Sequence, residues 1–178
     1  MESNRLKFKL VNGGDIDFFH QLLSLPESNR YNTLGAPKNR EESKEKLSDF
    51  VLKNEQKEIV SYTFVITTKQ DNKPIGLFGL NLKPKRYKGG EVWYTIHTKD
   101  WNKGFATESL KRIIEFCFNE LKLHRIQAGC AVDNISSIKV LEKSGMTKEG
   151  RGRQILPLSN GWSDNYEYSI LETDLKKK

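Results

Sequence analysis

The sequence reads Trp101-Asn102-Lys103-Gly104-Phe105-Ala106-Thr107-Glu108 at the junction between a strand-like run and a long segment of helical periodicity. A helix N-terminus carries unpaired backbone N–H groups and a partial positive charge, so it suits a phosphate group. Gly104 lets the backbone approach a ligand closely because it has no Cβ. Ala106 keeps the next turn small, and Lys103 adds a positive charge. The stretch therefore predicts a phosphate-binding loop that opens a helix.

Two common nucleotide motifs do not describe this loop. A Walker loop would end in Gly-Lys-Ser/Thr, and a dinucleotide fingerprint would read G-x-G-x-x-G. The stretch contains neither pattern. A glycine loop between a strand and a helix is by itself a weak signal, because many α/β proteins have one.

The chain after the loop alternates helices and strands. Apolar residues from Ala106 to Leu121 recur at helical spacing, and the next run, Arg125 to Val132, reads as a strand. A short helix follows from Ser136 to Lys143, and Gly145 suits a left-handed cap after it. Two further strands are expected near Thr147 to Leu156 and Trp162 to Leu171.

The chain before the loop is richer in strands. Residues 6–10 alternate in polarity, and residues 61–67 and 75–82 read as a hairpin. Helices are expected near residues 16–23 and 41–54, and a fourth strand from Glu91 to His97. We therefore predict one α/β domain spanning 1-178, with a mixed sheet and helices on both faces.

Composition limits the classes of protein. The chain has 178 residues, 36% of them hydrophobic, and a formal net charge of +7. No apolar run approaches the roughly 20 residues of a membrane span, and the first residues lack the apolar core of a signal peptide. Two cysteines do not make a disulfide framework, so we expect a cytoplasmic protein without membrane contact. The net charge indicates an anionic partner. We interpret the tail Lys176-Lys177-Lys178 as a solvated end.

Three motifs in order resemble the GNAT acetyltransferases, specifically the RimJ/RimL-like branch. In this family the acetyl-CoA loop reads Arg/Gln-x-x-Gly-x-Gly/Ala, and Gly104 and Ala106 fill its small positions while Trp101 replaces Arg or Gln. The second block is Leu123-His124-Arg125-Ile126, then Asp133-Asn134-Ile135-Ser136-Ser137, then Glu142-Lys143-Ser144-Gly145-Met146. The third is the C-terminal Gly161-Trp162-Ser163-Asp164 with Tyr168. The resemblance covers Ile75 to about Leu171.

The resemblance implies a GNAT acyl-CoA N-acyltransferase fold. Its sheet is twisted, mixed and mostly antiparallel, with fourth and fifth strands that splay apart, and acetyl-CoA lies in the split. By this resemblance Ile96 and Thr98 contact the pantetheine arm, and Asn134 bonds it from the far side. The pyrophosphate is then held by Lys103, Gly104, Phe105, Ala106 and Thr107.

The resemblance also implies direct acetyl transfer from the thioester to an amine. We assign Ser137 as the proton donor to the leaving thiolate, and the alternative is that Ser137 caps its helix. Leu156 stands where some members of the branch carry a glutamate base. Glu91, at the mouth of the fourth strand, is the next candidate base, with a solvated strand end as the alternative. A free backbone N–H near Ile96 would stabilise the tetrahedral oxyanion.

The acceptor is expected to be the N-terminal α-amine of a protein or peptide, of the ribosomal-protein type. The lower pKa of an α-amine, about 7.7–8.0 against about 10.4 for lysine, suits a site without a strong base. A small-molecule amine acetyltransferase (polyamine, aminoglycoside or amino acid) and a non-catalytic nucleic-acid binder are the rival classes. Association with the ribosome and a homodimer remain open. The three histidines and two cysteines have no metal-ligand spacing, so we expect no metal.

Overall fold

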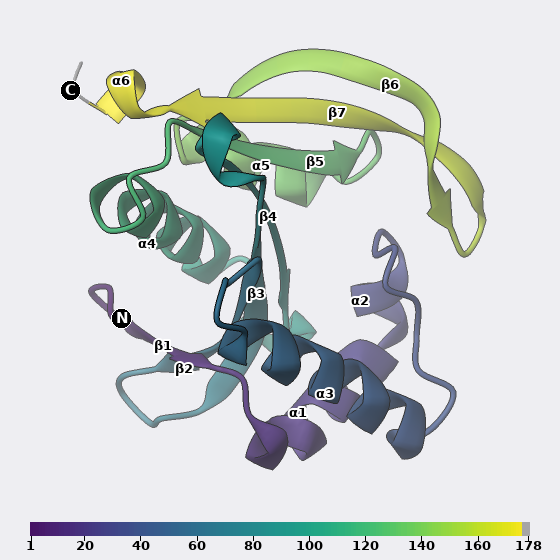
Figure 1. The fold of residues 1–178 in the computed structure, drawn as a ribbon. Coiled ribbons are helices and arrows are strands. Elements are labelled where there is room, and N and C mark those ends of the chain that lie inside the picture. The colour runs from purple at the N-terminus through teal and green to yellow at the C-terminus, as the bar shows by residue number, and fades with distance from the viewer. Residues whose placement is uncertain (176–178) are drawn as a thin grey trace.

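A computed structural model describes residues 1–175 and contains a seven-stranded sheet in the order β1-β2-β3-β4-β5-β7-β6 (Figure 1). The tail of three lysines, expected to be solvated, lies outside the described residues. The strands are β1 (Leu6–Leu10), β2 (Ser61–Thr68), β3 (Pro74–Leu82), β4 (Gly89–Ile96), β5 (Arg125–Ala131), β6 (Thr147–Leu158) and β7 (Gly161–Leu171). The longer helices are α1 (Ile16–Ser24), α3 (Arg40–Glu55), α4 (Phe105–Asn119) and α5 (Ile135–Lys143), and the short ones are α2 (Pro26–Asn29) and α6 (Glu172–Leu175).

One pair of neighbouring strands differs from the rest. All pairs are antiparallel except β4 and β5, which run parallel. In Figure 1, β4 runs down the picture whereas β5 and β7 run across it. The predicted mixed, mostly antiparallel sheet with splayed fourth and fifth strands is confirmed.

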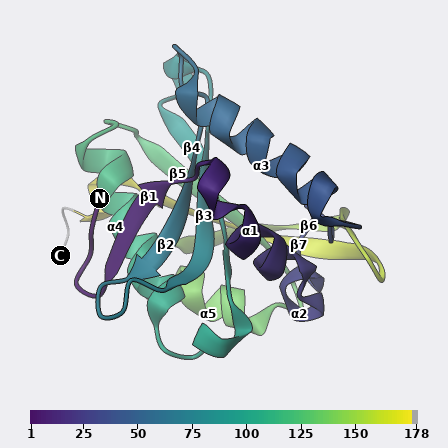
Figure 2. The ribbon, with the colours of Figure 1, turned by 90° about the horizontal axis from the view of Figure 1, so that it is seen from below.

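Helices cover both faces of the sheet, as the sequence predicted. Alternate residues of one strand point to opposite faces, and β2 and β3 have buried apolar residues on both. Val65 and Leu77 pack with α1 and α3, whereas Ile66 and Phe78 pack with α4 and α5. Figure 2 shows α4 on one side of β1 to β4, and α1 with α3 on the other. We call these the α4–α5 face and the α1–α3 face.

The remaining elements lie close to their expected bounds, but the sequence analysis did not predict the short helices α2 and α6. The helical stripe before Leu121 is buried through Leu110, Ile113, Ile114 and Cys117. Gly145 has a φ of +88°, the left-handed conformation expected after α5. The four-residue helix α2 was not predicted, because its sequence Pro-Glu-Ser-Asn carries turn residues and no apolar period.

Candidate active site

The two central strands separate after three residue pairs. β4 pairs with β5 at Gly89, Gly90 and Glu91, opposite Arg125 to Gln127. From Val92 to Ile96, β4 keeps its pairing with β3, but no pair to β5 exists within residues 1–175. The two strands therefore form a split that opens toward their C-terminal ends.

Backbone groups of β4 face this split. The N–H of His97 donates to the carbonyl of Ile75 at 2.8 Å, so His97 points toward β3. Backbone groups of successive residues point to alternate edges of a strand, and the register with β3 is continuous from Gly90 to Ile96. The backbone groups of Tyr94 and Ile96 therefore lie on the edge that faces the split.

Trp101 ties the loop to the end of β4. Its indole N–H donates to the Ile96 carbonyl at 2.7 Å, which leaves the Ile96 N–H as the donor at this edge. Trp101 departs from the family motif, and the motif alone does not predict this bond. A tryptophan here supplies one directed donor and an apolar ring that is 44% exposed.

The loop then turns into α4 through two residues in left-handed conformation. Asn102 has a φ of +59° and Gly104 a φ of +79°. The first intrahelical bond of α4 runs from the Glu108 N–H to the Gly104 carbonyl at 3.0 Å. The N–H groups of Phe105, Ala106 and Thr107 precede that bond and point out of the helix end. The residues that the sequence assigned to the pyrophosphate thus lie together at one helix N-terminus, which follows the open end of the split.

Two cations flank the helix end. Lys103 forms an ion pair with the buried Asp100, with 2.8 Å between Nζ and Oδ1. Arg5, from the chain just before β1, pairs with Glu108 at 2.6 Å and donates to the Lys103 carbonyl at 3.1 Å. Its guanidinium lies 4.6 Å from the centre of the Phe105 ring. Both cations would favour an anion at this end of α4.

The predicted site residues of α5 lie beside the split. Asn134 is the helix cap, because its Oδ1 accepts from the Ser137 N–H at 3.1 Å. The Ser137 hydroxyl therefore does not cap the helix. It lies 2.8 Å from the phenol oxygen of Tyr94 on β4, and it borders Cys130 on β5. Burial raises the pKa of the Cys130 thiol to about 11, and a hydrogen bond with Ser137 opposes that rise.

Glu91 lies apart from Ser137. It is exposed and occupies the last paired position of β4, between Asn81 of β3 and Gln127 of β5. Strand alternation places its side chain on the α1–α3 face, whereas Tyr94 points to the α4–α5 face. As the last paired position, Glu91 marks the closed end of the split. Leu156 is half-buried on β6 opposite Ser163.

The two residues after β4 make local bonds. Thr98 is half-buried and begins a short 3₁₀ turn, and its carbonyl accepts from the Trp101 N–H at 3.2 Å. His97 is buried, and its Nδ1 accepts from the Lys99 N–H at 3.2 Å. Thr98 therefore lies where β4 leaves the sheet, directly between the split and the helix end.

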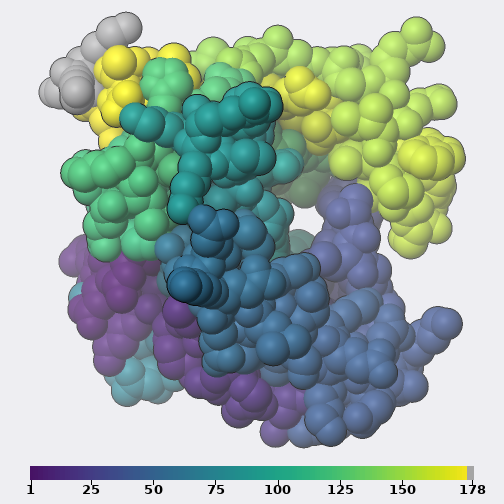
Figure 3. Space-filling model, viewed as in Figure 1, coloured from purple at the N-terminus to yellow at the C-terminus, as the bar shows by residue number. Residues whose placement is uncertain are grey.

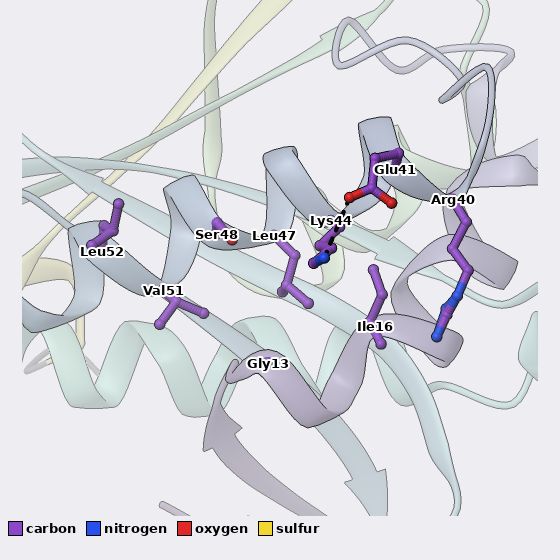
Figure 4. A pocket seen from close by; sticks show the side chains of 9 residues that line it. All are labelled: Gly13, Ile16, Arg40, Glu41, Lys44, Leu47, Ser48, Val51 and Leu52. Atoms are coloured by element: carbon purple, nitrogen blue, oxygen red, sulfur yellow. Dashed lines mark hydrogen bonds and ion pairs between the residues drawn. The ribbon is translucent and has the colours of Figure 1, made fainter.

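Hollows at the surface are of two kinds. Figure 3 shows an opening between the region of α2 and the β6–β7 hairpin. A separate hollow of about 500 Å³ lies between α1 and α3. Figure 4 shows its lining, which includes Ile16, Arg40, Leu47 and Val51 and none of the predicted site residues.

A split sheet with a helix N-terminus at the open end of the split is the central feature of this α/β protein. A family model described as an acetyltransferase (GNAT) domain matches residues 5–147, and the chain belongs to this family. It is therefore an acetyltransferase, and GNAT acetyltransferases use acetyl-CoA.

Known acetyltransferases are similar to this chain in sequence or in fold. The probable N-acetyltransferase YjcK of Bacillus subtilis is 32% identical over 89% of this chain and 83% of its own length. The putative ribosomal N-acetyltransferase YdaF of the same organism is 29% identical over 58% of this chain and 57% of its own. The structure of spermidine N-acetyltransferase from Vibrio cholerae, in complex with CoA and spermine, has a TM-score of 0.84 at 23% identity, covering 96% of this chain and 97% of that one.

Residues 1–175 lack the features of two other classes of protein. No helix in that range is long and apolar enough to cross a membrane. The same residues contain no group of three or more His, Cys, Asp or Glu side chains placed to hold a metal ion.

Gly104→Val tests the position of the phosphate site. The variant adds a side chain where the backbone is to approach the ligand, and we expect calorimetry to detect no acetyl-CoA binding. The left-handed backbone adds strain of about 1–2 kcal/mol, so the melting temperature falls as well. Gly35→Val is the matched control, because Gly35 has a similar φ of +70° with no atom within 4 Å of an added Cβ. Normal acetyl-CoA binding by the Gly104 variant would show that the pyrophosphate lies elsewhere.

Proposed function

We propose that this protein transfers an acetyl group from acetyl-CoA to the N-terminal α-amine of a protein or peptide, in the manner of the RimJ/RimL-like branch. The observation that carries the proposal is the continuity of the site. The open edge of β4 leads, through the Trp101–Ile96 bond, to the exposed N–H groups at the start of α4.

The residues present suit each part of the co-substrate. The N–H groups of Phe105, Ala106 and Thr107, with Lys103 beside them, would hold the pyrophosphate, and Gly104 leaves room for it. The pantetheine arm would lie along the open edge of β4 at Ile96 and Thr98. The Oδ1 of Asn134 accepts the hydrogen bond that caps the helix, so its Nδ2 group would be the donor to the arm.

The same edge would serve the reaction. The neutral amine attacks the thioester carbon, a C–N bond forms, and the C–S bond then breaks with its electron pair on sulfur. The Ile96 N–H, which strand pairing leaves unused, would stabilise the oxyanion. The Ser137 hydroxyl would donate to the sulfur as negative charge develops there.

The acceptor follows from what the site lacks. Leu156 cannot act as a base, and Glu91 lies on the opposite sheet face from Ser137. Glu91 would at most take the proton through water. An α-amine has a pKa of about 7.7–8.0, so a useful fraction is neutral near pH 7 without a strong base. A lysine side chain, with a pKa of about 10.4, would need more help.

Charge and likeness favour a ribosomal acceptor in the cytoplasm. The net charge of +7 would speed the approach to an RNA-rich particle at low salt. YdaF, which is similar over part of the chain, is described as a putative ribosomal N-acetyltransferase. A homodimer is compatible with this reading and stays part of the proposal.

A small cationic amine is the second candidate. Glu91 and Glu167 share the α1–α3 face through the register of β4, β5 and β7, and neither forms an ion pair within residues 1–175. Carboxylates on the face opposite the co-substrate would attract a polyamine. The similar fold of the spermidine N-acetyltransferase keeps this alternative in view.

Ser137→Ala is expected to lower kcat on the order of 10- to 1,000-fold, as for a lost proton donor. The affinity for acetyl-CoA should change little, because the cap is the Asn134 side chain and the Ser137 N–H remains. Ser136→Ala, on the exposed neighbour, is the matched control. An unchanged kcat in the Ser137 variant would remove the hydroxyl from the reaction.

A thiol-release assay should compare N-terminal peptides, internal-lysine peptides, polyamines and aminoglycosides at equal concentration. We expect the N-terminal peptides to give the highest kcat/KM. If the acceptor is carried by an RNA-rich particle, the rate of acetylation of that particle should fall as the salt concentration increases. A polyamine or aminoglycoside turned over well above every peptide would replace the proposed acceptor. If none of these amines caused thiol release, acetyl transfer itself would be contradicted.

A further inference from the structure

Tyr94 is the residue that joins the open part of β4 to α5. Its phenol oxygen lies 2.8 Å from the Ser137 hydroxyl. Its ring stacks on Phe78, its cross-strand partner on β3, with 5.6 Å between ring centres and 23° between planes. The stack fixes the ring, so the phenol oxygen is held at one place beside the split.

The acidity of a phenol favours one direction for the Tyr94–Ser137 hydrogen bond. A phenol is a stronger acid than an alkyl hydroxyl, so it is the better donor of the two. Burial raises the pKa of Tyr94 well above its usual value, so the phenol keeps its proton throughout the working pH range. The contact allows either hydroxyl to donate, and the role described below requires Tyr94 to donate and the Ser137 oxygen to accept.

The Ser137 hydroxyl then has its single hydrogen available to donate. A hydroxyl has a single O–H donor, and the Ser137 N–H is already engaged by Asn134. The Cys130 thiol of β5 is also near the hydroxyl, because a hydrogen bond with Ser137 opposes the rise that burial causes in the pKa of Cys130. With Tyr94 as the donor, the Ser137 hydrogen is left free for a group other than the phenol.

We propose that Tyr94 is a positioning residue for acetyl transfer, which orients the Ser137 hydroxyl so that its hydrogen points at the thioester sulfur. The inference rests on the proposed function of the split. A thioester sulfur bound between the strands would accept this hydrogen bond.

The role requires no proton to leave Tyr94. When the C–S bond breaks, its electron pair goes to sulfur, and the Ser137 hydrogen bond stabilises that charge. The amine loses its own proton to water, the thiolate takes the proton of the Ser137 hydroxyl, and the Ser137 oxygen regains a proton from solvent. Donation by Tyr94 makes the Ser137 oxygen less electron-rich and its hydrogen a better donor, because hydrogen bonds in a chain polarise one another.

Tyr94→Phe isolates this role, because the ring and its stack on Phe78 remain. We expect kcat to fall about fivefold to tenfold, the effect of one hydrogen bond of ordinary strength. The KM for the amine and the Kd for acetyl-CoA should stay within twofold of the wild type. The fall should be uniform from about pH 6 to 9, since Tyr94 does not titrate there. Tyr62→Phe is the control, because Tyr62 packs against the same core and stacks on Phe64.

The double variant Tyr94→Phe with Ser137→Ala decides how Tyr94 acts. If it works through Ser137, the double variant has the kcat of Ser137→Ala alone. The inference would be overturned if the two substitutions lowered kcat multiplicatively in the double variant. Loss of one limb of the pH profile in Tyr94→Phe, or a wild-type kcat in that variant, would also overturn it. A wild-type protein that acetylates no amine would instead contradict the proposed function, so the two failures are distinct.

Discussion

The loss of pairing between β4 and β5 after Glu91 is the constraint on which the rest of the site depends. A strand edge without a partner leaves backbone N–H and C=O groups unsatisfied, which is costly unless a ligand or side chain takes them. In this chain the Ile96 carbonyl is taken by the Trp101 indole. That bond fixes the loop to the strand end, so the free strand edge and the free N–H groups of α4 face one continuous site.

The split also separates two sets of side chains. Tyr94 points to the α4–α5 face, where Ser137 and Asn134 lie at the start of α5. Glu91 and Glu167 point to the α1–α3 face. A sheet is a single layer, so the thioester and the amine can approach the gap from opposite sides and meet between the strands. On the proposed function, Ser137 would act from one face of the sheet, and the candidate base Glu91 lies on the other.

The sequence predicted what depends on local signals. Gly104 with Ala106 indicated the helix end, and the strand and helix periods on each side indicated a mixed sheet; the motif resemblance supplied the splayed strands. Contacts between distant residues could not be predicted in this way. Arg5 reaches Lys103 across 98 positions, and Tyr94 reaches Ser137 across 43. The sequence also left two roles open for Ser137, helix cap and proton donor. The cap is Asn134, because its Oδ1 accepts from the Ser137 N–H.

The most direct test of this account is amide hydrogen exchange, measured by mass spectrometry with and without saturating acetyl-CoA. Unpaired N–H groups exchange quickly, so a ligand that bonds them slows their exchange. The account predicts slowing at the open edge of β4 from Val92 to Thr98 and at the helix end from Lys103 to Thr107. The hollow between α1 and α3 should be unaffected. Slowing confined to α1 and α3, or no slowing at the β4 edge and the helix end, would contradict the claim that the split holds the co-substrate.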